Sequence, residues 1–489
     1  MSVRGAAVWA MAGQYLSFAI QFAASVIISR WFLAPAEVGL FSIALAAALL
    51  VAVLQDFGLS RYIAGLPVLD RAEKVRCSCV AFLFSLVVAA IIAAAAWPLA
   101  RLYGHAELFP ILLIIAATYL FVPFGVVPLA LMARRMRFHG HFAVNVGGAA
   151  TQAIVAIALA AQGWSAFSLA WATLAAGIAR AGIAQALSPA WPWPFRLEGV
   201  RPVIAFGARS STLYLTGALG TRSPDLIVGK LLGLGAVGLY SRAVSLSDQF
   251  RMLVSGAIGS VFYPAFARIR DRGEPLGPAY LRVCAGYSAV VWPGMAGLAL
   301  AAEPLVRLLY GPAWMGTAPV LSAMALTEIM LVALPLVSDL PILMGRLNRL
   351  LAYNLIDTAL SVGMLAIGCL WGIEGAAASR LVYGALWLAL YGGFMHRIVG
   401  FDLRALVHIY ARSMAATLAA VLPLALGYML WQPADAMNFG ALLLLSGAGM
   451  AAWFAALLAV RHPVLHDLAG MLAALPTGPL RRRIERFAR

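Results

Sequence analysis

Nine arginines lie inside or close to long apolar runs of the sequence. They are Arg61, Arg180, Arg209, Arg222, Arg242, Arg251, Arg282, Arg380 and Arg412. Arginine keeps its charge when buried, and its planar guanidinium matches two phosphate oxygens. A charge in a bilayer core costs at least a few kcal/mol, so these side chains must face a cavity or an opposite charge. Those that face a cavity could bind an anion there, and those that face an acid would form structural ion pairs.

Four basic residues are the candidate lining of an anion path: Arg30, Arg209, Arg222 and Arg251. Two of them have an acid three residues away, in the pairs Arg222–Asp225 and Asp248–Arg251. Such pairs either neutralise each other or contact a substrate. Arg30 either forms an outer gate with Lys230, which lies 200 positions later, or extends to the lipid headgroups.

The first apolar run carries a narrow polar stripe. Gln14, Ser17, Gln21 and Ser25 are separated by three or four residues, so a helix places them on one face. Gln14 and Gln21 therefore join the candidate lining of a hydrophilic lumen.

Four carboxylates are candidates for carrying a coupling proton: Asp56, Glu328, Asp339 and Asp357. Burial favours the neutral form of a carboxyl group, which suits proton uptake. Glu328 and Asp339 are 11 positions apart and would share a face of one helix, beside Pro335 and Pro341. The alternative for each acid is a structural carboxylate with satisfied partners.

No pattern of metal ligands or catalytic residues accompanies these groups. The four cysteines are scattered, His139 and His141 read as a solvated loop pair, and His462 falls on the tail. We find no nucleophile–base constellation and no phosphate-binding loop. We therefore expect neither a metal, a cofactor nor an enzymatic activity.

The composition is that of a polytopic membrane protein. Hydrophobic residues make up 63% of the 489 positions and charged residues 11%, which leaves too little polar surface for a soluble domain. The net charge of +16 could suggest nucleic acid as a partner. The basic residues lie mostly in short loops between apolar runs, which excludes that interpretation.

The apolar runs predict 14 membrane-spanning helices. They are 8–30, 38–65, 79–98, 109–131, 141–161, 165–187, 203–232, 237–264, 281–302, 316–344, 350–371, 374–396, 406–430 and 437–460.

Internal similarity divides these spans into two repeats. PLARLYG at 98–104 matches PLVRLLYG at 304–311, and VGLFS at 38–42 matches VGLYS at 237–241. The spans therefore form two six-helix repeats around a central cavity, followed by two extra helices. The predicted parts are an N-lobe over 1–190, an interfacial linker over 191–202, a C-lobe over 203–400, two further helices within 401–460, and a basic tail over 461–489.

The loop charges orient the chain. Alternate loops carry 22 basic residues and the remaining loops carry four. By the positive-inside rule, we expect both termini to lie in the cytoplasm. The linker, with Trp191 and Trp193, and the arginine-rich tail suit contact with membrane lipids.

Several segments together resemble a known family. They are GQYLSFAIQFAASVIISRWFLAPAEVGLFSIA at 13–44, QDFGLSRYIAG at 55–65, VGLYSRAVSLSDQF at 237–250, VFYPAFARIRD at 261–271 and AEPLVRLLYGPAW at 302–314. They resemble the polysaccharide transporter family of the multidrug/oligosaccharidyl-lipid/polysaccharide flippase superfamily. The resemblance covers most of residues 5–400.

This resemblance implies a bacterial inner-membrane flippase. Its relatives move an oligosaccharide repeat unit on a polyprenyl pyrophosphate between leaflets, by alternating access of two lobes with a cationic lumen. The products would be surface polysaccharide, exopolysaccharide or lipopolysaccharide. A polysaccharide polymerase and export machinery would be partners.

Three alternatives stay open from sequence alone. A flippase for a lipid-linked peptidoglycan precursor shares the helix number and the cationic lumen. A multidrug exporter of the same superfamily would favour an acidic, aromatic cavity. A membrane glycan polymerase or ligase usually has a long outward loop, whereas the outward loops here are short.

Overall fold

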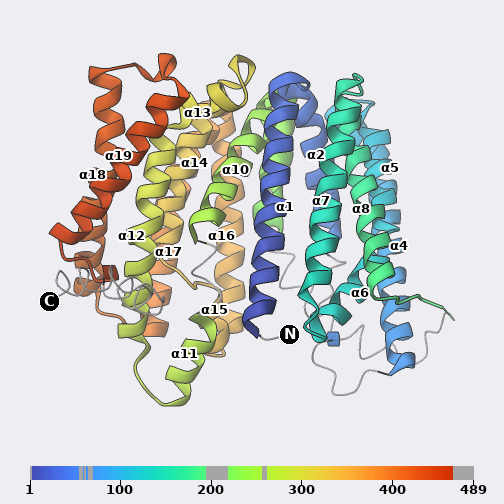
Figure 1. Ribbon diagram of the computed structural model, residues 1–489, viewed down its shortest axis with the longest axis horizontal. Helices are drawn as coiled ribbons and strands as arrows, with labels where there is room; N and C mark the ends of the chain where they lie inside the picture. Colours follow the sequence, from blue (N-terminus) through green and yellow to red (C-terminus); the bar gives the residue numbers. More distant parts are fainter. Residues whose placement is uncertain are drawn as a thin grey trace. The chain divides into compact units, whose positions relative to one another are not determined.

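The computed structural model describes residues 3–53, 59, 62–63, 70–193, 218–255 and 262–465. These residues form helices and turns, without a β-strand among them (Figure 1). The chain divides into two compact units, Met1–Gly238 and Leu239–Arg489. The first unit thus includes residues 218–232, which are helical. The predicted lobe boundaries come from sequence repeats and remain a prediction.

The N-terminal unit is built from long apolar helices. They are α1 (Val3–Trp31), α2 (Pro35–Ala52), α4 (Arg71–Tyr103), α5 (Leu108–Tyr119), α6 (Pro123–Arg134), α7 (Phe138–Ala161) and α8 (Phe167–Leu187). Helix α7 packs between α1 and α8, and α5 lies against α2, α4 and α8. Asp70 starts α4 by accepting a hydrogen bond from the Glu73 N–H, and Gly104 ends it in a left-handed conformation.

The C-terminal unit contains the remaining helices. They are most of α10 (Leu234–Ser255), then α11 (Phe262–Asp271), α12 (Leu276–Leu300), α13 (Ala302–Leu309), α14 (Thr317–Val332), α15 (Asp339–Leu343), α16 (Leu347–Gly368), α17 (Gly372–Val399), α18 (Leu403–Leu430) and α19 (Phe439–Ala459), with short 3₁₀ turns η2 (Pro312–Trp314), η3 (Cys369–Trp371) and η4 (Ala434–Ala436). Helix α12 packs on α14 and α18, and α17 packs on α14 and α16.

The helices bear out an all-helical membrane protein. Among the described residues, nine helical stretches are long and apolar enough to cross a membrane, and a tenth follows if α5 and α6 form one bent span. One stretch, Leu347–Val399, contains both α16 and α17, which correspond to two separate predicted spans. The total of fourteen remains a prediction.

The fourth predicted span, 109–131, is bent. Helices α5 and α6 meet at an angle of 41°, where Pro123 opens α6. The side-chain amide of Gln185, on α8, donates to the carbonyl oxygen of Phe124 at 3.0 Å. A polar side chain thus satisfies a backbone group at the bend, as a bilayer requires.

The tenth predicted span, 316–344, was wrongly taken as one continuous helix. Helix α14 ends at Val332 and α15 begins at Asp339. Pro335 disfavours helical geometry in the residue before it, and Leu336 has a positive φ of 60°. The Tyr410 hydroxyl, on α18, donates to the carbonyl oxygen of Ala333. The fourth and tenth spans occupy the same position in the two repeats, and both break.

The two matching VGL segments touch each other reciprocally within the N-terminal unit. A Cβ on Gly39 would collide with the carbonyl oxygen of Leu234, and one on Gly238 with that of Pro35. The offset is 199 for both Pro35/Leu234 and Gly39/Gly238. The contact is therefore nearly twofold symmetric, and it places two backbones so close that only glycine fits.

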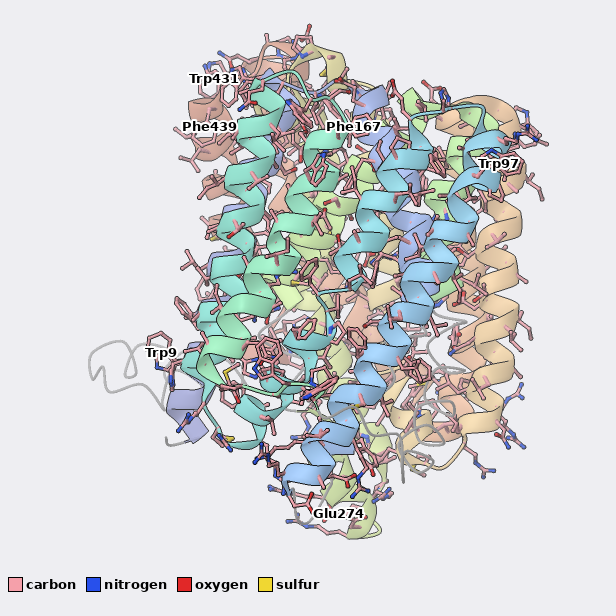
Figure 2. All side chains as sticks on the ribbon, turned by 90° about the vertical axis from the view of Figure 1, so that its right-hand side faces the viewer. Trp9, Trp97, Phe167, Glu274, Trp431 and Phe439 are labelled. Atoms are coloured by element: carbon pink, nitrogen blue, oxygen red, sulfur yellow. The ribbon has the colours of Figure 1, made fainter. Side chains whose placement is uncertain are left out.

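The predicted inward loops, which are rich in arginine, lie at one end of the C-terminal unit, and the predicted outward loops lie at the other. Arg270 donates to the carbonyl oxygen of Leu343 at 2.8 Å, which joins the end of α11 to the end of α15. Arg307, on α13, donates to the carbonyl oxygen of Asp435 in η4. Figure 2 shows Glu274 at one end, with Trp431 and Phe439 at the other. Aromatic residues at helix ends are typical of a membrane interface.

His462, expected in a solvated tail, is buried instead. Only 2% of it is exposed, and its ring Nε2 lies 3.0 Å from the Ser413 hydroxyl. Ser413 is in turn 2.7 Å from the Ser288 hydroxyl. This chain of hydrogen bonds ties the segment after α19 to α18 and α12.

The glycine contact predicts an asymmetry between two neighbouring substitutions on α10. Gly238→Ala should lower the thermal unfolding midpoint in detergent, because its Cβ would overpack the backbone at a cost of about 1–3 kcal/mol. Gly235→Ala is the matched control, since a Cβ there meets no atom within 4 Å. Equal midpoints for the two variants would contradict the close contact.

The buried histidine predicts a pH dependence of stability. Burial, together with the nearby charge of Arg412, lowers the pKa of His462 from 6.5 to about 4. Between pH 6.5 and about pH 4 the unfolded chain therefore binds a proton that the folded chain does not. The free energy of unfolding falls as the pH is lowered through this range. His462→Gln should flatten this fall in the thermal midpoint, whereas His408→Gln, at an exposed position, should not. A wild-type slope in His462→Gln would contradict the assignment.

Candidate functional site

Arg251 lies between two carboxylates in the C-terminal unit. Its guanidinium is 3.1 Å from Asp248, one turn earlier on α10, and 3.2 Å from Glu328 on α14. The Glu328 side chain is 17% exposed, against 51% for Asp248. The pairing of Arg251 with Asp248 is thus the structural ion pair that the sequence allowed. The bond to Glu328 is the more buried of the two.

A second arginine continues this arrangement on α16 and α17. Arg380 donates to the Ser361 hydroxyl at 2.8 Å and lies 4.3 Å from the centre of the Tyr383 ring. The Tyr383 hydroxyl donates to Asp357 at 2.9 Å. Arg380 attracts both Glu328 and Asp357 electrostatically. Hydrogen bonds thus join α16 to α17, and the ion pair of Arg251 with Glu328 joins α10 to α14. The electrostatic attraction between Arg380 and Glu328 relates the two pairs of helices.

We call Asp248, Arg251, Glu328, Asp357 and Arg380 the charged network. When ionised, its three carboxylates and two guanidiniums carry a net charge of −1. An uncompensated charge among apolar helices is costly, so uptake of one proton or one monovalent cation would neutralise the group.

In the N-terminal unit, Arg180 is an arginine with no acid beside it among the described residues. It lies on α8, half-buried, with its side chain over Gly148 of α7. Its Nε has no hydrogen-bond partner, and no ion pair joins it to an acid in the part of the chain that the structure describes. Gly148 leaves room for the guanidinium, because a Cβ there would overlap it. Arg180 is therefore suited to an anion from outside the unit.

The predicted path residues on α1 are accessible. Gln14, Gln21 and Arg30 are exposed, and the Arg30 guanidinium lies 5.9 Å from the Trp31 ring centre. Helix α1 packs against α7 through Gly13 and Phe142, which leaves the glutamines uncovered within the unit. Their place in a lumen remains a prediction.

Arg222 and Asp225 attract each other but do not form one of the close ion pairs found in the described ranges. Arg222 is exposed and also lies near Tyr119. It thus keeps a guanidinium available to a ligand. Arg209 and Asp56 lie outside the described residues.

Asp339 does not share a helix face with Glu328, as the sequence had suggested. The helix breaks between them, and Asp339 is the exposed first residue of α15. Glu328 and Asp357 are held by an arginine and a tyrosine, respectively. The coupling role of the candidate acids remains a prediction.

Arg180 and Arg380 were not among the candidate lining residues chosen from sequence. Each lies on the sixth predicted span of its repeat and extends to the fifth, at Gly148 and Ser361. An arginine on the same span of both repeats was the available signal. For metal binding, the described residues contain no group of three or more suitable His, Cys, Asp or Glu side chains.

The Arg251–Glu328 bond predicts non-additive stabilities. Arg251→Gln should lower the thermal midpoint, because it leaves the Glu328 carboxylate unpaired. The expected loss in the free energy of unfolding is about 1–3 kcal/mol. Adding Glu328→Gln should recover part of the loss. Arg272→Gln, which removes an exposed pair at 3.8 Å with Glu274, serves as the control and should have little effect. Additive losses in the double variant would contradict a direct interaction.

Comparison with known proteins places the chain in a family. A family model described as polysaccharide biosynthesis protein matches residues 27–319. The succinoglycan biosynthesis transport protein ExoT of Rhizobium meliloti (strain 1021) is 26% identical over 392 residues, which cover 78% of this chain and 76% of that protein. The lipopolysaccharide biosynthesis protein WzxC of Escherichia coli (strain K12) is 25% identical over 174 residues, or 36% of this chain and 35% of WzxC.

The fold is that of a solved transporter. The lipid II flippase MurJ in an inward closed conformation superposes with a TM-score of 0.73 at 14% identity, covering 94% of this chain and 99% of MurJ. At this identity the likeness concerns the fold alone. The family match spans more than half of the chain and confirms the resemblance drawn from its segments. The chain belongs to the polysaccharide biosynthesis protein family.

Proposed function

We propose that this protein flips a polyprenyl-pyrophosphate-linked oligosaccharide repeat unit across the bacterial inner membrane for surface polysaccharide synthesis. The observation that carries the proposal is Arg180, a half-buried guanidinium on an apolar helix with no acid beside it in the described structure. The diphosphate of such a lipid would supply the missing negative charge. The family and the relatives named for transport in polysaccharide synthesis support the same cargo class.

Different residues would contact different parts of the substrate. Arg180 offers a guanidinium to the pyrophosphate, whose oxygens it can bind in pairs. The exposed Arg222 and Arg30 extend the positive potential along the N-terminal unit. Gln14 and Gln21 on α1 present amides, which suit the hydroxyl groups of a sugar. Arg209 would join them near the cytoplasmic start of its span.

Movement follows from the two repeats. An N-lobe over 1–190 and a C-lobe over 203–400 would alternate between access to the two leaflets, with both termini in the cytoplasm. The reciprocal Gly39–Gly238 contact holds matching segments of the two repeats together. A polymerase and export machinery would take up the delivered repeat unit.

The charged network would couple transport to an ion. Its net charge of −1 is neutralised by one proton or one monovalent cation, at Glu328 or Asp357. Neutralisation would weaken the attraction of the acids for Arg251 and Arg380, and so change how α10, α14, α16 and α17 are held together. Asp56 and Asp339 are the other candidate acids.

The function is tested by substituting Arg180 in a strain that lacks the chromosomal gene. Arg180→Gln should reduce surface polymer about tenfold or more, because a lost charged hydrogen bond costs about 1.5–3 kcal/mol. The lipid-linked repeat unit should accumulate on the inner leaflet. Arg180→Lys should retain part of the export, since it keeps the charge.

Arg101→Gln is the matched control, because Arg101 is exposed and stacks 4.1 Å from the Trp97 ring centre. It should export normally. Normal export by Arg180→Gln at a normal protein level would contradict the proposed role. A trapped peptidoglycan precursor in place of the repeat unit would identify the other lipid-linked cargo.

A further inference from the structure

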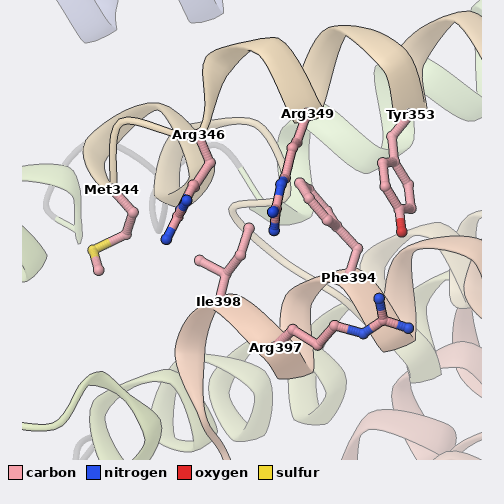
Figure 3. Close-up of a pocket in the computed structure, with 7 residues that line it drawn as sticks. All are labelled: Met344, Arg346, Arg349, Tyr353, Phe394, Arg397 and Ile398. Atoms are coloured by element: carbon pink, nitrogen blue, oxygen red, sulfur yellow. The ribbon is translucent and has the colours of Figure 1, made fainter.

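A basic pocket lies between the start of α16 and the end of α17, within the C-terminal unit. Its volume is about 410 Å³ and it is lined by Met344, Arg346, Arg349, Tyr353, Phe394, Arg397 and Ile398. Figure 3 shows Arg346 and Arg349 projecting from α16 toward Phe394 and Ile398 of α17. Three arginines therefore line one small hollow.

The three arginines lack a close acidic partner within the described ranges. None of them forms an ion pair with an acid among the described residues. Asp402, the next acid after α17, accepts a hydrogen bond from the Arg404 N–H at 2.9 Å and so caps α18. Repulsion among the arginines is thus left to be relieved by a bound anion.

Backbone geometry adds to the positive potential. Arg346 is the N-cap of α16, and no side chain caps the free N–H groups of the first turn. A helix of 22 residues presents a partial positive charge at this end. Arg349 sits within the same turn, so its charge and the helix end act on the same volume.

The rest of the lining is apolar and aromatic. The rings of Tyr353 and Phe394 stack with centroids 4.2 Å apart, and Met344 and Ile398 flank them. A free phosphate ion gains nothing from such walls, whereas the glycerol and first acyl carbons of a lipid do. The pocket also lies at helix ends on the side where basic loops gather, which is the predicted cytoplasmic headgroup layer.

We propose that this pocket binds the phosphate headgroup of an anionic glycerophospholipid from the inner leaflet. Arg346, Arg349 and Arg397 hold the phosphate, and the Tyr353–Phe394 stack receives the glycerol. The bound lipid joins α16 to α17, which also carry Asp357 and Arg380. The proposal needs only a membrane protein and does not rest on the identity of the cargo.

The test compares two triple variants by native mass spectrometry of protein released from bilayers of phosphatidylcholine with a minor fraction of phosphatidylglycerol. The pocket variant carries Arg346→Gln, Arg349→Gln and Arg397→Gln. The control carries Arg268→Gln, Arg272→Gln and Arg404→Gln, three exposed arginines outside the pocket, and so loses the same charge. Thermal midpoints verify that both fold, and single variants at Arg346 and Arg397 replace the triple if it does not.

The wild type and the control should retain phosphatidylglycerol, and the pocket variant should bind it roughly a hundredfold more weakly, since three arginines at about 1 kcal/mol each sum to about 3 kcal/mol. Equal retention by all three proteins, or equal loss in both triples, would overturn the site.

Inorganic phosphate and undecaprenyl pyrophosphate are added as competitors. Displacement by inorganic phosphate at equal concentration would overturn the lipid assignment. Retention of undecaprenyl pyrophosphate without phosphatidylglycerol would assign the pocket to the cargo instead.

Discussion

An arginine on a membrane-spanning helix of this protein must face an opposite charge, a hydrophilic cavity or the lipid headgroups, because the bilayer core holds no water to solvate it. The structure meets this requirement in different ways. In the C-terminal unit Arg251 is held by Asp248 and Glu328. In the N-terminal unit Arg180 has no such acid among the described residues. One arginine is paired with acids of the protein itself, and we propose that the other is paired by a ligand.

The polypeptide backbone obeys the same constraint. Each interrupted helix leaves carbonyl groups without their usual partners, and side chains from neighbouring helices satisfy them. Gln185 does so at the bend between α5 and α6, and Tyr410 at the end of α14. The breaks recur at matching positions of the two repeats. They give each repeat a point where its helices change direction without exposing unpaired backbone to lipid.

Sequence reasoning identified the class of protein and one of its two candidate local ion pairs, because both depend on short-range patterns. Hydropathy indicated the helices, and the spacing of Asp248 and Arg251 indicated their ion pair. It did not find the bond from Arg251 to Glu328, since these residues are 77 positions apart and meet only when α10 packs near α14. The shared face assigned to Glu328 and Asp339 was wrong, because Pro335 ends the helix that would have aligned them.

The sequence also did not indicate which side chains tertiary contacts would bury. His462 follows the last apolar run and reads as part of a basic tail, yet Ser413 and the packing of α18 enclose it. Arg180 lies in the room that Gly148 leaves on the facing helix, a contact that the sequence does not indicate. The basic pocket joins residues near 346 with residues near 397, and its hollow arises from how α16 and α17 pack. Each feature required the positions of neighbouring helices.

The central claim is that this chain moves a pyrophosphate-linked oligosaccharide across a bilayer. The most direct measurement reconstitutes the purified protein in vesicles loaded on one leaflet with fluorescent lipid-linked oligosaccharide, and follows the exposure of its sugar to an impermeant lectin. Wild-type protein should expose the sugar, and Arg180→Gln should slow its appearance to near the rate of protein-free vesicles. Equal rates with wild-type protein and with empty vesicles would contradict the account.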